Sequence, residues 1–277
     1  MKALRRSKYL RSLSYELDDL SLMEEFHEAT KFFPDTTLPA ILPRIVSYLT
    51  DQRAILETAH NRKVYRYADK IALPAPAGTL MSLEKCLARR RTARRFGHTA
   101  LGLEKLSALL YRAIAPTREV TLSDEQGLRL MTRPYASGGG LYPIEIYPVL
   151  MNVAEHSVQV THYDPFAHQL SMIGKPSRAE VLQAFGDVEE RLNAASVVFV
   201  LTSVTERTAV KYGMRGYRFA LLEAGQIAQN LSLCAVSEGL GSLPWGGYAD
   251  DDVGRLLGID NVREIVVHLL SIGEVAA

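Results

Sequence analysis

The chain has 277 residues, a formal net charge of +1 and 47% hydrophobic residues, a composition typical of a soluble globular protein. The balanced charge gives no overall reason to expect binding to nucleic acid or to an acidic membrane surface. The sequence lacks an apolar run long enough for a membrane span, and its basic start is not followed by the apolar stretch of a secretory signal. Two distant cysteines and scattered histidines without zinc-type spacing predict a cytoplasmic protein with reduced thiols and no metal.

Residues 1–80 differ in composition from the rest of the chain. They have a helical pattern, are rich in tyrosine and arginine, and carry no strand signals. They end in a proline- and glycine-containing stretch, residues 73–78, whose composition is typical of a linker. The sequence therefore predicts a helical N-terminal extension, residues 1–80, that packs on the main domain or docks a partner, followed by a main domain over residues 81–277.

The main domain mixes helical and strand patterns. Helices are expected from Ser82 towards Arg90 and from Leu103 to near Pro116, followed by a mobile connection over residues 117–132. The next predicted elements are strands at 144–150, 158–163 and 169–173, a short helix at 178–185, and a strand at 196–204. The last of these strands is a continuous run rich in β-branched residues, which predicts a buried position in a sheet.

The longest helix is expected from Tyr217 to Glu238, where Gly239 suits a left-handed cap. Apolar residues lie nearly all round it, so we expect it to be buried in the core or in a dimer interface. A short helix opens with the acidic residues 250–252, and a final strand covers 264–272. Together these elements predict the α+β class.

A run of three glycines follows Ser137 and precedes a predicted strand. Glycine reaches positive φ at little cost and lets a ligand approach the backbone closely. The N–H groups of Gly138 and Gly139 can then point at phosphate oxygens or at the polar edge of a ring, and Ser137 adds a hydroxyl. A flexible loop is the alternative interpretation.

The arginine-rich segment 89–95 lies at the end of a predicted helix. Guanidinium groups bind phosphate in a bidentate manner, and Thr92 adds a hydrogen-bonding hydroxyl. Taken alone, such a run more often forms a solvated or nucleic-acid-facing surface.

Two further segments have polar chemistry beside glycine. The Pro-Trp-Gly-Gly-Tyr motif at 244–248 again exposes backbone N–H groups to a flat ligand, although a plain turn fits it equally well. In the segment 211–218, Lys211 is adjacent to Tyr212 and is expected to lower the pKa of the phenol, which would make Tyr212 a general base. The alternative is two surface residues at a helix end.

Together these segments resemble the nitroreductase-type flavoproteins. The resemblance is strongest to the azoline dehydrogenase branch, which acts in the biosynthesis of thiazole/oxazole-modified peptides of the streptolysin S and microcin B types. Order and spacing match that branch over residues 82–273, through the segments 90–94, 134–143, 211–218, 223–230 and 244–248. The Ser-Gly-Gly loop combined with the Lys-Tyr and Arg-Gly-Tyr-Arg segment is specific to the branch. In the N-terminal part only residues 26–31 are similar.

The resemblance implies a nitroreductase-like fold, with a central, mostly antiparallel sheet, flanking helices and a long buried helix, and FMN held at a homodimer interface. The positions that match contacts to the FMN phosphate and ribityl chain are Arg90, Arg91, Thr92 and Arg94. Simple nitroreductases also place basic residues near the C-terminus for the phosphate. This chain ends without them, and Arg218 is expected to take over that role.

The remaining positions implied by the resemblance concern the flavin ring and the chemistry. A loop that often comes from the second subunit is matched by Ser137, Gly138 and Gly139, and the N–H groups at the reactive edge of the flavin by Gly246 and Gly247. Lys211 and Tyr212 match the pair regarded as catalytic in azoline dehydrogenases.

The predicted function is FMN-dependent oxidation of thiazolines and oxazolines, formed from Cys, Ser or Thr of a precursor peptide, to thiazoles and oxazoles. Tyr212, assisted by Lys211, is expected to take the proton while the flavin takes the hydride. The expected partners are a second copy of the chain, cyclodehydratase subunits and the precursor peptide. The alternatives are an NAD(P)H-dependent nitroreductase or quinone reductase, and a scaffold subunit that docks a cyclodehydratase.

Overall fold

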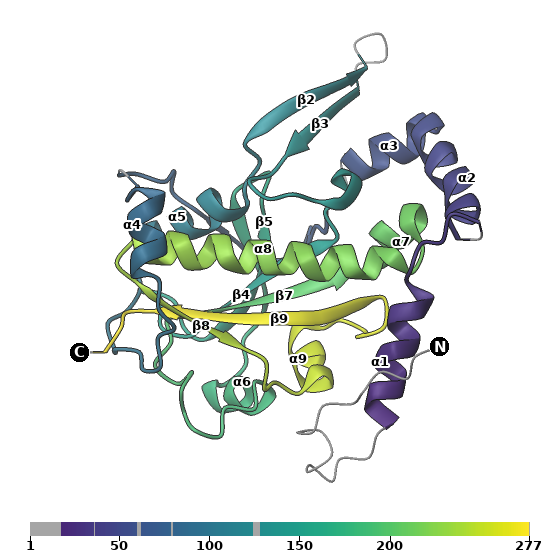
Figure 1. Ribbon diagram of the computed structural model, residues 1–277. Helices are drawn as coiled ribbons and strands as arrows, with labels where there is room; N and C mark the ends of the chain where they lie inside the picture. The colour runs from purple at the N-terminus through teal and green to yellow at the C-terminus, as the bar shows by residue number, and fades with distance from the viewer. Residues whose placement is uncertain (1–17, 36, 60–61, 79, 124–127, 277) are drawn as a thin grey trace.

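The computed structural model describes residues 18–35, 37–59, 62–78, 80–123 and 128–276 (Figure 1). A seven-stranded sheet forms its centre, with the strand order β1-β6-β5-β4-β7-β9-β8. Every neighbouring pair in it is antiparallel, as predicted. The strands are β1 (Lys70–Ala72), β4 (Ile144–Leu150), β5 (Gln159–Asp164), β6 (Gln169–Gly174), β7 (Val197–Val204), β8 (Gly241–Trp245) and β9 (Glu264–Gly273). The predicted α+β class is confirmed.

The interior strand β7 contributes side chains to two hydrophobic cores. Side chains alternate between the two faces of a strand, so Phe199 and Leu201 join the core on one face, and Val198 and Val200 join the core on the other. Because both faces are covered, the strand is a continuous apolar run rather than an alternating one.

Helices cover both faces of the sheet (Figure 1). One face carries α4 (Leu83–Arg89), α5 (Leu103–Ile114) and the long α8 (Arg215–Ser237), and the other carries α6 (Arg178–Ala184) and α9 (Asp250–Leu257). Helix α8 ends before Gly239, whose φ of 74° allows the left-handed cap that the sequence predicts. Within one chain one face of α8 is buried in the core, at Ile227 and Leu231, whereas Leu222 on another face is 65% exposed.

The N-terminal part of the chain forms α1 (Asp18–Ala29), α2 (Thr37–Thr50) and α3 (Gln52–Ala59). The expectation that residues 1–80 contain no strand is wrong, because β1 pairs with β6 at the edge of the main sheet. The residues before β1 are also tied to the core, since the Lys63 Nζ lies 2.6 Å from the Glu264 Oε2 and 2.7 Å from the Tyr147 hydroxyl. Residues 1–17 of the predicted extension lie outside the described residues.

The proline-containing stretch that was expected to be a linker also lies against the main body. The Ser107 hydroxyl donates to the Pro74 carbonyl, and the Arg112 guanidinium donates to the Ala77 carbonyl at 2.7 Å. Both donors belong to α5, so hydrogen bonds hold this stretch on the surface of the helix.

The mobile connection expected over residues 117–132 is instead an antiparallel hairpin, β2 (Arg118–Ser123) and β3 (Leu128–Thr132), with Val120 opposite Leu130. Two short runs containing β-branched and aliphatic residues flank a turn-type sequence there, which is a hairpin signal. Pairing satisfies the backbone groups that the two runs turn towards each other, which a mobile connection would leave to water.

A last helix, α7 (Glu206–Tyr212), lies between β7 and α8 and packs against α2. Within the described part of the chain, no helix has the length and apolar character needed to cross a membrane.

Candidate functional site

The glycine loop is a single tight turn fixed to its surroundings. Gly139 and Gly140 both have positive φ, 68° and 69°, which glycine adopts without a Cβ penalty. The Ser137 hydroxyl accepts a hydrogen bond from the Tyr142 N–H at 2.9 Å and so closes the turn.

Two side chains of α8 hold the segment that leads into this loop. The Gln226 Oε1 accepts a hydrogen bond from the Ala136 N–H at 2.9 Å, and the Asn230 amide donates to the Pro134 carbonyl at 3.2 Å. These bonds give the Gln226 and Asn230 positions of the matching segment 223–230 a structural role, and they favour an ordered loop over a flexible one.

The glycine loop lies directly against the predicted catalytic pair. A Cβ placed on Gly139 would lie 2.7 Å from the Tyr212 hydroxyl and 2.9 Å from the Lys211 Nζ, closer than real Cβ contacts allow. A Cβ on Gly138 would meet the ring of Phe219 at 3.1 Å. The fold therefore brings two segments that are far apart in the sequence into contact, and glycine is the residue that permits the approach.

A strained turn presents the pair at the end of α7. Gly213 has φ 54° and ψ −142°, a combination that residues with a side chain rarely adopt. Gly213 turns the chain between α7 and α8. The Tyr212 ring meets the Phe219 ring edge-on, with their centroids 5.0 Å apart.

The surroundings of the pair change the roles expected from the sequence. Lys211 is only 6% exposed, and burial lowers its pKa from the ordinary value of 10.5. Burial, reinforced by the nearby Tyr48, raises the pKa of Tyr212. The expectation that Lys211 lowers the phenol pKa is therefore wrong in direction. These directions make the Lys211 amine easier to deprotonate than an ordinary lysine and the Tyr212 phenol harder to deprotonate than an ordinary tyrosine.

Sequence reasoning missed Tyr48, which α2 contributes to this site. Its ring centroid lies 4.7 Å from the Lys211 Nζ, and the residue is 9% exposed. The ring keeps water from the amine, and its π-face attracts the charged form. Burial is the cause of the lowered Lys211 pKa, and the Tyr48 ring contributes to that burial.

Replacing Tyr48 with alanine is expected to raise the pKa of Lys211 towards its ordinary value, because water reaches the amine. Tyr48→Phe keeps the ring and should leave the pKa unchanged. The pKa can be read from the pH dependence of Lys211 labelling by an amine-reactive reagent, followed by mass spectrometry. An unchanged pKa in the alanine variant would contradict this role.

The arginine segment lies along the beginning of β8. Thr92 forms a bridge with Ser242, and the Ala93 N–H donates to the Ser242 carbonyl at 2.8 Å. Arg91 and Arg94 are exposed, and Arg94 lines an open cavity of about 590 Å³ opposite residues 189–194.

Strand β8 connects this segment to the second glycine pair. The Trp245 indole N–H donates to the Phe185 carbonyl at 2.7 Å, and the Gly247 carbonyl packs so closely on Gly186 that a Cβ there would lie 2.2 Å away. Gly246 faces open space. At ordinary strand geometry Ser242 and Gly246 are about 13 Å apart, so the arginines and Gly246 lie towards opposite ends of one strand.

Helix α7, which carries Lys211 and Tyr212 beside the glycine loop (together the loop group), and helix α4, which leads into segment 90–94 (the arginine group), lie at opposite ends of α8 (Figure 1). Gly138 contacts Phe219, whereas Met81, two residues before α4, donates its N–H to the Ser237 hydroxyl. These two positions on α8 are about 27 Å apart. Arg218 lies at the Phe219 end and donates to the His27 carbonyl at 2.7 Å, so within one chain it is separated from the arginines that it was expected to assist.

The fold and the sequence place the chain among the oxidoreductases. It belongs to the nitroreductase family, whose model matches residues 87–274.

Two curated relatives are similar in sequence. A Methanocaldococcus jannaschii protein assigned as a nitroreductase, MJ1384, is 29% identical over 205 residues, which cover 74% of this chain and 97% of that protein. The microcin B17-processing protein McbC of Escherichia coli is 34% identical over 135 residues, 46% of this chain and 49% of McbC. The second match therefore spans about half of each protein.

Two solved structures show the extent of the shared fold. A protein from Anabaena variabilis assigned as a nitroreductase superposes with a TM-score of 0.63 and 27% identity, over 76% of this chain and 42% of that chain. A chain of the E. coli microcin synthetase McbBCD complex with truncated pro-MccB17 bound superposes with a TM-score of 0.58 and 23% identity, over 95% of both chains. The second likeness includes the N-terminal helices, which are therefore part of a shared fold.

Proposed function

We propose that the protein is an FMN-dependent azoline dehydrogenase that oxidises thiazoline and oxazoline rings of a precursor peptide. The observation that carries the proposal is the contact of Gly139 with both the Lys211 amine and the Tyr212 hydroxyl. It unites the two segments whose combination is specific to that branch of the family. The similarity to the microcin B17-processing protein supports the same substrate class.

The residues of the arginine group, together with Gly246, fit FMN. Exposed guanidinium groups at Arg91 and Arg94, together with Thr92, suit a phosphate. Arg90 is half-buried beside them, and Gly246 leaves open space where a flat ring can approach the backbone. When bound, FMN supplies an acceptor for the hydride that leaves the azoline.

Lys211 and Tyr212 then have separate roles, proton removal and orientation of the azoline ring. The neutral Lys211 amine takes the second hydrogen of the azoline as a proton, and the Tyr212 hydroxyl donates a hydrogen bond that orients the ring. Loss of one hydride and one proton makes the ring aromatic, so the protein's main tasks are orientation and proton removal.

A second copy of the chain completes the site in this proposal. The loop group and the arginine group are too far apart along α8 to meet one cofactor within one chain. The surface that α4 and α8 expose carries Leu83, Leu87 and Leu222, with exposed fractions of 63%, 54% and 65%. Such side chains favour burial against a partner, and a symmetric dimer would join one copy's loop group to the other's arginine group.

Replacing Leu222 with glutamate is expected to convert the dimer to monomers and to release FMN, because two charges would be buried in the interface. The oligomeric state is measured by analytical ultracentrifugation and the FMN content by absorbance. The matched control is Val188→Glu, which changes an apolar residue that is 93% exposed and lies outside α4 and α8. A dimeric Leu222 variant with full FMN content would remove this interface.

The N-terminal helices carry a separate surface that suits a partner subunit. Leu42, Val46 and Leu49 follow helical spacing on α2 and are 48%, 56% and 57% exposed. We propose that cyclodehydratase subunits dock there, which adds a scaffold role to the catalytic one.

The test of the function begins with the absorbance of the purified protein. We expect a flavin spectrum with about one FMN per chain, and loss of two hydrogens per ring when a thiazoline peptide is offered under air. A colourless protein that refuses added FMN would overturn the redox function and leave the scaffold role. Rapid flavin bleaching by NADPH with no action on the azoline would favour a nitroreductase or quinone reductase.

A further inference from the structure

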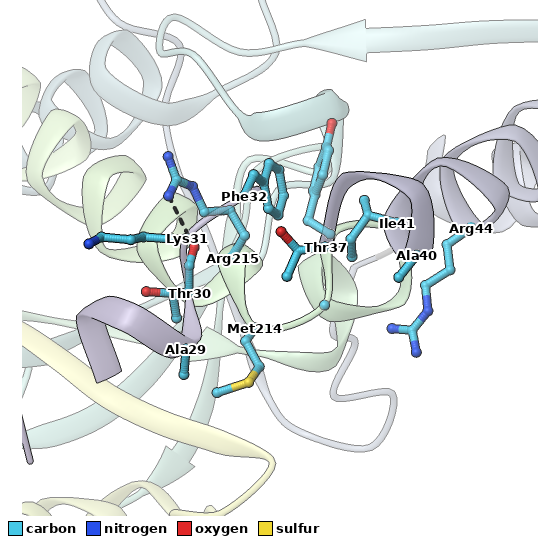
Figure 2. Close-up of a pocket in the computed structure, with 12 residues that line it drawn as sticks. Ala29, Thr30, Lys31, Phe32, Thr37, Ala40, Ile41, Arg44, Met214 and Arg215 are labelled. Atoms are coloured by element: carbon cyan, nitrogen blue, oxygen red, sulfur yellow. Dashed lines mark hydrogen bonds between the residues drawn. The ribbon is translucent and has the colours of Figure 1, made fainter. Parts of the chain in front are cut away.

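A groove separates the N-terminal helices from the turn that carries the catalytic pair (Figure 2). It consists of two adjoining cavities of about 210 Å³ and 430 Å³. Both are lined by Arg44, Gly213 and Met214, and Tyr212 lines the smaller one. The groove therefore lies between α2 and the turn that follows α7, and Tyr212 of the catalytic pair forms part of its lining.

The smaller cavity is lined by three cationic side chains, Lys31, Arg44 and Arg215, and by no carboxylate. Lys31 is paired with Glu28, and Arg215 donates to the Thr30 carbonyl at 3.0 Å. Figure 2 shows the second of these bonds as a dashed line.

Arg44 differs from the other two cations. Among the described residues its guanidinium has no hydrogen-bond or ion-pair partner, and a Cβ on Gly213 would lie 3.5 Å from its Nη1. Arg44 is exposed and lies against Gly213, the residue that follows Tyr212, so it can receive an anion from a molecule that occupies the cavity beside Tyr212.

The larger cavity supplies apolar contacts beside this charge. Phe26, Met214 and Tyr217 line it and are 39%, 59% and 37% exposed. A guanidinium next to an open apolar wall suits a peptide that presents a carboxylate and an apolar side chain close together.

We propose that this groove binds the peptide segment next to the reacting azoline and that Arg44 receives a carboxylate of that peptide. The proposal rests on the proposed function and adds a substrate preference to it. The carboxylate belongs to an Asp or Glu side chain or to the C-terminus of the peptide, and the same guanidinium recognises both by bidentate hydrogen bonding. Arg44 is thus a specificity-determining residue, supplied by α2 rather than by the nitroreductase body.

The test uses the FMN-loaded full chain and four fluorescent peptides with a single thiazoline. The residue after the ring is Glu or Gln, and the C-terminus is a free acid or an amide. Fluorescence anisotropy gives the Kd of each peptide. Arg44→Gln is expected to weaken binding of peptides with the recognised carboxylate about tenfold and to leave the Gln amide peptide unchanged. Arg44→Lys should keep part of the preference.

The matched control is Arg53→Gln, which removes an exposed arginine of α3 that lines neither cavity. Comparison of the Glu and free-acid peptides identifies the source of the carboxylate. Equal affinities of Arg44→Gln and wild type for all four peptides, or an equal loss for all four, would overturn the proposal. The proposal would also be overturned if Arg44→Glu no longer bound the cyclodehydratase subunit but kept its affinity for every peptide. The groove would then be a subunit interface.

Failure of this inference and failure of the proposed function give different results. If wild type prefers the carboxylate peptides through Arg44 but leaves the thiazoline unoxidised, the result supports the groove assignment and contradicts the proposed dehydrogenase function. If wild type oxidises all four peptides and Arg44→Gln oxidises them with the same Kd and KM, the result contradicts only the groove assignment.

Discussion

Replacing Gly139 with alanine is expected to lower azoline turnover at least a hundredfold while the protein remains folded. The new methyl group would lie 2.7 Å from the Tyr212 hydroxyl and 2.9 Å from the Lys211 Nζ, so both side chains must move. Displacement of catalytic groups by about 1 Å is enough for a loss of this size. The measurement is the rate of thiazole formation by mass spectrometry, with the unfolding midpoint determined in parallel.

Gly239→Ala separates this clash from backbone strain. Gly239 has φ 74°, close to the 68° of Gly139, but a Cβ there would meet nothing within 4 Å. Both variants therefore pay the cost of a left-handed alanine, about 1 kcal/mol, and only Gly139→Ala disturbs the catalytic pair. Equal turnover in the two variants would show that the loop does not control the pair.

Replacing Lys211 and Tyr212 together with alanine is expected to stop azole formation and to leave FMN bound. The loss should reach about 10²- to 10⁴-fold, the contribution typical of a positioned acid or base. FMN should remain because neither side chain belongs to its proposed phosphate ligands, which lie in segment 90–94. Turnover is measured by mass spectrometry and FMN content by absorbance.

Single substitutions assign the two roles. Lys211→Met should cost more turnover than Tyr212→Phe, because burial lowers the pKa of the lysine and raises that of the tyrosine. Wild-type activity should rise as pH increases through the lowered Lys211 pKa, since the amine acts in its neutral form. Val210→Ala, at a neighbouring side chain that is 60% exposed, is the matched control. Full azole yield from the double variant would remove the catalytic assignment.

Elements with a strong local pattern were predictable from the sequence. The apolar run of β7 and the helical pattern of α8 were placed within about two residues, because burial on both faces and a glycine cap leave clear signals. Short edge elements were missed. Strands β1 and β8, of 3 and 5 residues, depend on pairing with β6 and β9 for their existence.

In the candidate site too, some residues were recognisable from the sequence and others were not. Glycines at 138–140 and at 246–247 could be recognised because a close approach to the backbone needs a residue without a Cβ. Tyr48 and Arg44 carried no such signal. Each is an ordinary helix residue until α2 packs against α7 and brings it to the catalytic turn.

The sequence by itself determined the residue types of the chemistry and the order of the segments that place the chain in the nitroreductase family. Those are local properties: glycine frees φ, and arginine, lysine and tyrosine carry their functional groups wherever they lie. Only the tertiary structure decided which segments meet, that Arg218 lies apart from the arginine segment of its own chain, and that the pKa of Lys211 is lowered while that of Tyr212 is raised. A pKa depends on burial and on neighbours distant in the chain, and folding alone sets both.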